Sequence, residues 1–103
     1  MVKVSVLYPN TTGTKFDMAY YLDYHIPMVG RLLGSALKGV SVEQGICGEE
    51  RGSTAPYIAS GHVLFDSVQN FQSSFAAHAR EIMGDIPKHT NSEPPVQIGE
   101  VKL

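Results

Sequence analysis

The 103-residue sequence has no tryptophan, only one cysteine and no long hydrophobic run. Because Cys47 has no second thiol, no intramolecular disulfide can form, which is typical of proteins from a reducing cytoplasm. No segment approaches the roughly 20 apolar residues that a membrane-spanning helix needs. The start of the chain also lacks the basic and apolar regions of a signal peptide. We therefore predict a soluble, unprocessed cytoplasmic protein.

Clustered positive charge is also missing. Eight Lys and Arg oppose ten Asp and Glu, for a net charge of −2, and the basic residues are spread singly. Electrostatic binding of nucleic acid or of an anionic membrane needs clustered basic residues, so we predict neither partner. Neutral or small polar ligands suit this surface better. The length predicts a single domain over residues 1–103, with a modest core that a second copy of the chain would help to bury.

The spacing of apolar residues predicts six elements. They are a strand over 2–8, a helix over 15–33, strands over 40–47 and 57–65, a helix from 68 to about 84, and a strand over 96–101. Gly34 is expected to cap the first helix, and Asp66 or Ser67 to begin the second. With right-handed crossovers, this order gives an α+β fold, the ferredoxin-like βαββαβ sandwich. It has an antiparallel four-stranded sheet with two helices on one face.

The face of the sheet without helices needs a cover of its own. The first strand carries Val4 and Val6 on one side and Leu7 on the other, which indicates that both faces are buried. We predict that the sheet of a second copy covers this face, giving a homodimer. RNA-recognition modules share the topology, but they need basic and aromatic residues on the central strands. The third strand lacks that signature, so we reject this alternative.

The stretch YYLDYHIPMV, residues 20–29, places a histidine among tyrosines on the first helix. Tyr21 and His25 are four residues apart and therefore neighbours on one helical face. His25 also lies seven residues from Met18 and is expected to point inward. Pro27 cannot donate a backbone hydrogen bond, so we predict a kink just after His25 that opens room beside its ring.

His78 occupies a similar position on the second helix, three residues after Phe75. Both histidines should lie on the order of 15 Å from the starts of their helices, so we expect them to face one cavity. A buried imidazole needs polar partners, which Tyr21, Ser60 or Asp85 could supply. Such a pair suits acid–base chemistry near neutral pH. The alternative interpretation is that both histidines only pack in the core.

The remaining histidines carry weaker signals. His62 is on the third strand and could face either the cavity or the subunit interface, and His89 is expected in a solvated loop. No two histidines are four residues apart or close to a carboxylate cluster, so we predict no metal site. The sequence has no flavin, nicotinamide, haem or phosphate-binding motif, so we also predict no cofactor.

Taken together, four runs of sequence resemble the EthD family, named for a protein of ethyl tert-butyl ether degradation. They are VSVLYPN, FDMAYYLDYHIPMVGRLLG, HVLFDSVQNFQSSFAAHAREIMGDIP and TNSEPPVQIGEV, which span nearly the whole chain. The resemblance implies a dimeric α+β barrel with a pocket between sheet and helices in each subunit. His25 and His78 match the family's helix histidines. Lys88 and His89 stand where the family typically has tyrosine or phenylalanine, so the pocket edge is expected to differ.

The resemblance leaves two functional hypotheses open, because family members accompany monooxygenase systems or act as dehydratase-like or pigment-pathway enzymes. The first is a cofactor-independent enzyme that acts on a small aromatic or ether-like metabolite. Its predicted catalytic residues are His25, Tyr21 and His78, and its predicted substrate-binding residues are Tyr20, Tyr24, Met28, His62 and Phe75. The second is a non-catalytic accessory protein that binds a small molecule for a partner oxygenase. A purely structural dimer is a third interpretation.

Overall fold

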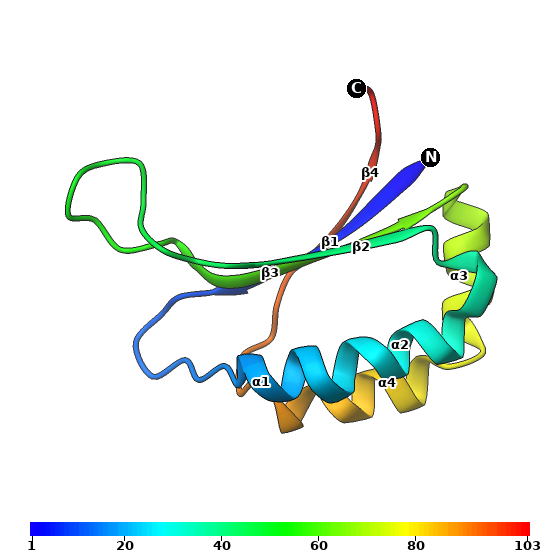
Figure 1. Cartoon of the computed structure of the whole chain (residues 1–103), viewed down its shortest axis with the longest axis horizontal. Helices are drawn as coiled ribbons and strands as arrows, with labels where there is room; N and C mark the ends of the chain where they lie inside the picture. Colours follow the sequence, from blue (N-terminus) through cyan, green and yellow to red (C-terminus); the bar gives the residue numbers. More distant parts are fainter.

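The structure is a computed structural model that describes all residues, 1–103. Four strands, Val2–Pro9 (β1), Gly39–Gln44 (β2), Tyr57–Phe65 (β3) and Val96–Glu100 (β4), form one antiparallel sheet in the order β2-β3-β1-β4. The helical elements are Met18–Tyr20 (α1), Tyr21–His25 (η1), Ile26–Leu33 (α2), Gly34–Ala36 (η2), Val68–Ala76 (α3), Ala79–Asp85 (α4) and Ile86–Lys88 (η3). The helices lie on one face of the sheet (Figure 1). The predicted α+β ferredoxin-like fold is therefore confirmed.

The ends of the elements follow from local chemistry. The first helix begins later than predicted because Phe16 pairs with Thr90 as an isolated β-bridge. Asp17 then caps the helix by accepting a hydrogen bond from the backbone N–H of Tyr20 at 3.0 Å. Gly34 ends α2 with a φ of 58°, which glycine adopts without strain. Ser67 caps α3 by accepting from the N–H of Asn70.

The predicted kink at Pro27 takes a different form. The five residues Tyr21–His25 form a π turn, in which the N–H of Ile26 bonds the carbonyl of Tyr21. The wider turn suits a helix in which Pro27 cannot bond the carbonyl four residues back. The helix continues through Pro27 without a break, from α1 through η1 to α2 (Figure 1). The π turn, a feature often found at functional sites, lies where His25 points inward.

The second predicted helix is in fact two. α3 ends at Ala76 and α4 begins at Ala79, and His78 lies at the break with a φ of −129°. The N–H of His78 bonds the carbonyl of Phe75, three residues back, which closes a tight turn. The chain changes direction there, and α4 runs alongside α2 (Figure 1). Beyond this break, Ile82 on α4 packs into the hydrophobic core.

Two groups of buried side chains hold the layers together. The larger joins sheet and helices through six residues, Val2, Val4, Val29, Leu33, Phe65 and Ile82. Burying each such side chain contributes about 1.5–3 kcal/mol. The smaller group consists of Tyr8, Tyr21 and Ala59 and lies nearer the first helix's start. β1 and β3 therefore supply the hydrophobic surface that faces the helices, and any site between the sheet and the helices lies against this surface.

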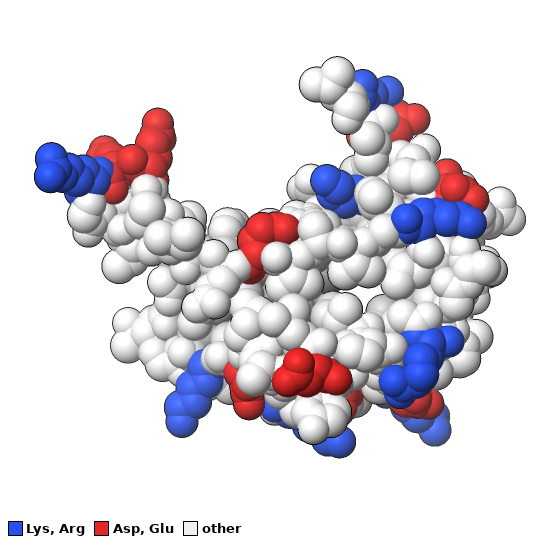
Figure 2. Space-filling view, in the orientation of Figure 1, with Lys and Arg blue, Asp and Glu red and all other residues white.

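Charged residues lie around the periphery of the molecule. Figure 2 shows Lys and Arg interspersed with Asp and Glu, and no patch of a single sign on the face in view. No helix has both the length and the hydrophobicity to cross a membrane.

Candidate functional site

A cavity of about 610 Å³ lies between the sheet and the helices, which is within the usual range for small-molecule sites. Hydrophobic residues supply 15 of its 21 lining positions, so a ligand there would be mostly apolar. Two of these hydrophobic residues, Tyr8 and Tyr21, also carry hydroxyl groups, and His25 and Glu93 are among the other lining residues. Figure 2 shows a hollow between the sheet layer and the helical layer, bordered mostly by uncharged residues.

His25 is held at this cavity by a carboxylate from the other helix. Its ring is 5 % exposed, and Nδ1 lies 2.9 Å from Oδ2 of Asp85, at the end of α4. The hydroxyl of Tyr20 donates a hydrogen bond of 2.7 Å to the other carboxylate oxygen, Oδ1. Lys88 Nζ lies 3.7 Å from the same oxygen, with an exposed side chain. Asp85 therefore bridges α4 and the π turn.

The contacts of Asp85 fix its protonation state and the tautomer of its partner. Burial acts to raise the pKa of Asp85, but the hydrogen bonds from His25 and Tyr20 outweigh it and lower that pKa below its ordinary value. An ionised carboxylate only accepts hydrogen bonds, so Nδ1 of His25 carries the proton. No protein group bonds Nε2 of His25. In the neutral ring, Nε2 has a lone pair available to a molecule in the cavity.

Tyr21 lies flat against His25, with ring centroids 5.5 Å apart and planes 14° from parallel. Its hydroxyl reaches the floor of the cavity above Gly61, where a Cβ atom would overlap it. Burial raises the pKa values of both Tyr21 and Tyr8 above the ordinary value, so both hydroxyls stay protonated. Tyr21 can therefore donate a hydrogen bond to an oxygen beside His25. Gly61 is the residue that makes room for it.

His89 completes the cluster, contrary to the prediction of a solvated loop residue. The turn η3 and the pairing of Thr90 with Phe16 fold it inward, where it is 2 % exposed. Its ring centroid lies 4.5 Å from that of His25, and its Nε2 lies 3.3 Å from the hydroxyl of Tyr8. Its Nδ1 is buried without a hydrogen-bond partner, an arrangement that costs about 1–3 kcal/mol. Burial and the neighbouring His25 lower the pKa of His89 to about 4, so it is neutral.

The predicted site residues divide into three groups. His25, Tyr21 and Phe75 line the cavity together. Tyr20 is hydrogen-bonded to Asp85 and is not among the cavity-lining residues, and Tyr24 stacks on Tyr20 but is 65 % exposed. Met28 packs against the hydrophobic core instead of the cavity.

His78 does not join His25. It is half-buried at the break between α3 and α4 and is not among the residues that line the cavity. The prediction that both helix histidines face one cavity was wrong, because it assumed one straight helix. Asp85, seven residues further along, occupies the place beside His25. Among the candidate partners that the sequence allowed for a buried imidazole, Asp85 is the one that bonds it.

His62 belongs to a separate group of polar residues. His62 is among the residues that line the cavity, but the alternation of side chains along β3 places its ring on the open face of the sheet, opposite Ser5. Nδ1 lies 2.8 Å from Ser5 Oγ, and Nε2 lies 2.9 Å from Glu43 Oε1. Of the two positions that the sequence left open, the structure selects the face away from the helices.

Three of these side chains could also hold a metal ion. One ring nitrogen each of His25 and His89 and a carboxylate oxygen of Asp85 lie within 4.8 Å of one another. The spacing argument against such a group considered neighbours along one helix, whereas these ligands come from η1, α4 and the residue after η3. Sequence spacing gives no signal for a group assembled in this way.

The comparisons with known proteins agree with this architecture. The chain matches no protein-family model, and no curated protein matches it. It is similar to the crystal structure of an EthD-like protein from Ralstonia eutropha JMP134, with 42% identity, a TM-score of 0.95, and coverage of 99% of this chain and 92% of that one.

More distant structures share the fold alone. An ethyl tert-butyl ether degradation (EthD) family protein from Bacillus halodurans C-125 matches with a TM-score of 0.67, 19% identity and 99% coverage of both chains. HapK from Hahella chejuensis matches with a TM-score of 0.59 and 12% identity, over 99% of this chain and 93% of that one. The identity and coverage of the Ralstonia match establish the relationship: this chain belongs to the EthD-like family.

Proposed function

We propose that the protein binds a small, mostly apolar metabolite in the cavity and transfers a proton to or from it through His25. The observation that carries this proposal is the hydrogen bond of 2.9 Å between His25 Nδ1 and Asp85, at the edge of an apolar cavity of about 610 Å³. A carboxylate that holds one ring nitrogen leaves the other free to act as a general base.

In the proposed reaction, Nε2 of His25 accepts a proton from the substrate, and the electron pair stays on the substrate. The imidazolium that forms is stabilised by Asp85, whose carboxylate is already ionised. The hydroxyl of Tyr21 donates a hydrogen bond to the oxygen that gains negative charge. Tyr20 holds Asp85 in place through its hydrogen bond of 2.7 Å and is a positioning residue. The reaction requires no redox step.

The cavity lining indicates the chemical class of the metabolite. Its hydrophobic walls, which include Val4, Val6 and Phe75, favour an aromatic or ether-like body. The polar groups gather near His25 and Tyr21, which suits a molecule with one oxygen function, such as a phenol or a ketone. Placement of the protein beside a monooxygenase, in the cytoplasm, is part of this proposal. Its support is the family's association with ether degradation and the single free thiol, Cys47.

The same lining favours a second candidate, a non-catalytic carrier. With 15 of 21 lining residues hydrophobic, most of the binding free energy would come from apolar contact, which His25 does not supply. A carrier would keep its affinity when His25 loses its basic nitrogen. The two candidates therefore differ in what a substitution of His25 changes.

The experiment that separates them begins with a thermal-shift screen of phenols, quinones, short polyketide-like aromatics and ethers. Ligands that bind the folded state raise its melting temperature by mass action. Turnover of each hit is then followed by mass spectrometry in the wild type and in His25→Gln, which keeps a donor for Asp85. Loss of product with retained binding supports acid–base catalysis. Binding without product in either protein supports the carrier, and no binding to the wild type overturns both.

We also propose that the open face of the sheet pairs with the same face of a second copy. Leu7 and Leu64 are half-buried on this face beside His62, and no helix covers them. Light scattering should report a dimer that Leu64→Glu converts to a monomer. Leu22→Glu, on the exposed side of the first helix, is the control and should leave the mass unchanged. A monomeric wild type would contradict this pairing.

A further inference from the structure

The cluster of His25, Asp85 and His89 has a feature that proton transfer does not use. Nδ1 of His89 is fully buried and has no hydrogen-bond partner, while Nε2 is 3.3 Å from the Tyr8 hydroxyl. With its proton on Nε2, the ring donates to Tyr8 and leaves a lone pair on Nδ1. A buried lone pair without a partner is unfavourable, and a proton donor or a cation beside it would stabilise it.

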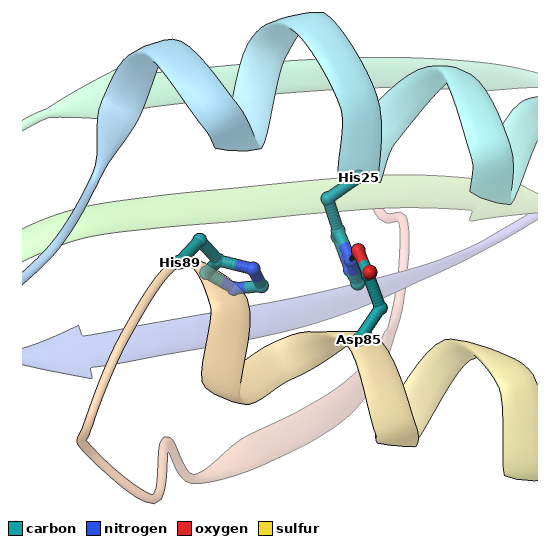
Figure 3. A group of neighbouring side chains, drawn as sticks. All are labelled: His25, Asp85 and His89. Atoms are coloured by element: carbon teal, nitrogen blue, oxygen red, sulfur yellow. Dashed lines mark hydrogen bonds and ion pairs between the residues drawn. The ribbon is translucent and has the colours of Figure 1, made fainter.

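The surroundings of that lone pair favour a cation. Figure 3 shows the ring of His89 turned toward His25, which comes from the facing helix, and toward Asp85, which comes from the end of α4. One donor atom from each of the three residues lies within 4.8 Å of the others. Asp85 contributes a negative charge, and Oδ2 of Asp85 already lies 2.9 Å from Nδ1 of His25. Two imidazoles and one carboxylate form a ligand set that zinc and ferrous iron use in proteins.

Two tyrosines support the ligands from outside. Histidines that bind metals are usually held through their other ring nitrogen, and metal-binding carboxylates are themselves hydrogen-bonded. The Tyr8 hydroxyl contacts Nε2 of His89, and the Tyr20 hydroxyl donates to Oδ1 of Asp85, so that Oδ2 remains available. Lys88 Nζ, 3.7 Å from Oδ1, is the opposing positive charge, and its side chain is 65% exposed and free to turn away.

We propose that His25 Nδ1, Asp85 Oδ2 and His89 Nδ1 bind a divalent transition-metal ion of the zinc class. Donor atoms around one such ion lie about 2.0–2.2 Å from it and roughly 3.3 Å from one another, so the longest separation must shorten. The adjustment falls on His89, which follows the short turn η3. Binding at Nδ1 requires the one proton of the neutral His25 ring to move to Nε2, because a nitrogen that binds metal carries no hydrogen.

The metal-bound and metal-free forms differ in what His25 can do. Once Nδ1 holds the metal, the ring carries its one proton on Nε2, which can no longer accept another. The proposed site therefore has two exclusive states, and a zinc ion should block any proton transfer through His25. This inference goes beyond the proposed function and does not depend on it, since the ion can be measured without a substrate.

The test is titration calorimetry of EDTA-dialysed protein with ZnCl₂ in a buffer that binds zinc weakly. The wild type should bind one equivalent of zinc. His89→Phe keeps the aromatic packing and the pair of His25 and Asp85, and it should weaken binding at least tenfold. His62→Gln, at the half-buried imidazole on the open face of the sheet, and Cys47→Ser, at the exposed thiol, should leave the affinity within twofold.

The opposite results would overturn the proposal. These are an absence of binding to the wild type at about 100 μM ZnCl₂, or binding that survives His89→Phe and disappears in His62→Gln or Cys47→Ser. A crystal soaked in zinc adds a second readout. An anomalous peak between His25, Asp85 and His89 supports the site, whereas a water bonded to His89 Nδ1, with no anomalous peak, rejects it.

Discussion

Two pairs of a histidine and a carboxylate lie on opposite faces of the sheet. Their nitrogen-to-oxygen distances are equal, but their surroundings differ. On the helical side, His25 Nδ1 and Asp85 Oδ2 are 2.9 Å apart, and their side chains are 6% and 11% exposed. On the open side, His62 Nε2 and Glu43 Oε1 are also 2.9 Å apart, but their side chains are 21% and 53% exposed. Distance alone does not distinguish these two pairs.

Burial distinguishes them. Water competes for the hydrogen bonds of His62 and Glu43, the open pair, and not for those of His25 and Asp85, the covered pair. An exposed ion pair contributes roughly 0–1 kcal/mol, whereas breaking a buried pair leaves an unpaired group in a medium of low dielectric. The covered pair also faces a cavity, so its imidazole has both a fixed orientation and a space for a ligand. The comparison therefore supports the proposed role of His25 in proton transfer and favours a local structural role for His62 within one subunit.

The largest effect should come from removing the covered carboxylate. Asp85→Ala leaves His25 Nδ1 and the Tyr20 hydroxyl without their shared acceptor and should lower the free energy of unfolding by about 3 kcal/mol. Urea denaturation of the variant and the wild type measures the difference. If the free energy of unfolding falls by less than about 1 kcal/mol, the pair of His25 and Asp85 contributes no more than an exposed ion pair does, and burial does not distinguish the two pairs.

The next largest effect should be a dependence of the free energy of unfolding on pH that comes from His89, on the helical side of the sheet. The pKa of His89 is about 4 in the folded protein and about 6.5 when unfolded, so between these values the unfolded chain binds the additional proton. His89 therefore makes stability fall as the pH drops from about 6.5 to about 4, by up to about 1.4 kcal/mol per pH unit. Denaturation in EDTA at several pH values measures the slope.

The matched variant for this slope is His89→Phe, which removes the ionisable group from the same buried position. Its stability should depend less on pH over the same interval, because one proton uptake on unfolding is lost. Equal slopes in the two proteins would show that His89 titrates in the folded state as it does in the unfolded state.

A smaller effect should follow from filling the space above Gly61. A Cβ there overlaps the Tyr21 hydroxyl, so Gly61→Ala should displace that ring and cost about 1–2 kcal/mol. Gly99→Ala, on the edge strand with nothing near its added Cβ, should change stability by less than about 0.5 kcal/mol. Any ligand found by the screen should bind Gly61→Ala more weakly, whereas similar stabilities for the two variants would mean that Tyr21 can move freely.

The sequence predicted what depends on local pattern. The strand over 57–65, the caps at Gly34 and Ser67, and the inward direction of His25 all follow from period, turn chemistry and helical spacing. The stacked contact between Tyr21 and His25 follows from their separation by four residues. These features need no knowledge of how distant segments meet.

The cluster's other members depended on tertiary contacts that local pattern does not contain. The break at His78 redirects α4, which moves Asp85 into the place expected for His78. The bridge between Phe16 and Thr90 draws in His89, which composition alone assigned to solvent. The assembled site was therefore beyond prediction from spacing, although Asp85 was among the candidate partners for an imidazole.

The smallest effect should come from the open pair, and its size should depend on protein concentration. In one isolated subunit Glu43 is half-exposed, so Glu43→Ala should cost less than about 1 kcal/mol. If two copies pair through this face, the same carboxylate becomes buried, and the cost should rise with concentration as the dimer forms. Melting curves from about 1 to 100 μM protein measure this, with Asp85→Ala as the variant whose loss stays constant. A loss for Glu43→Ala that is small at every concentration would leave this face in water and contradict the proposed pairing.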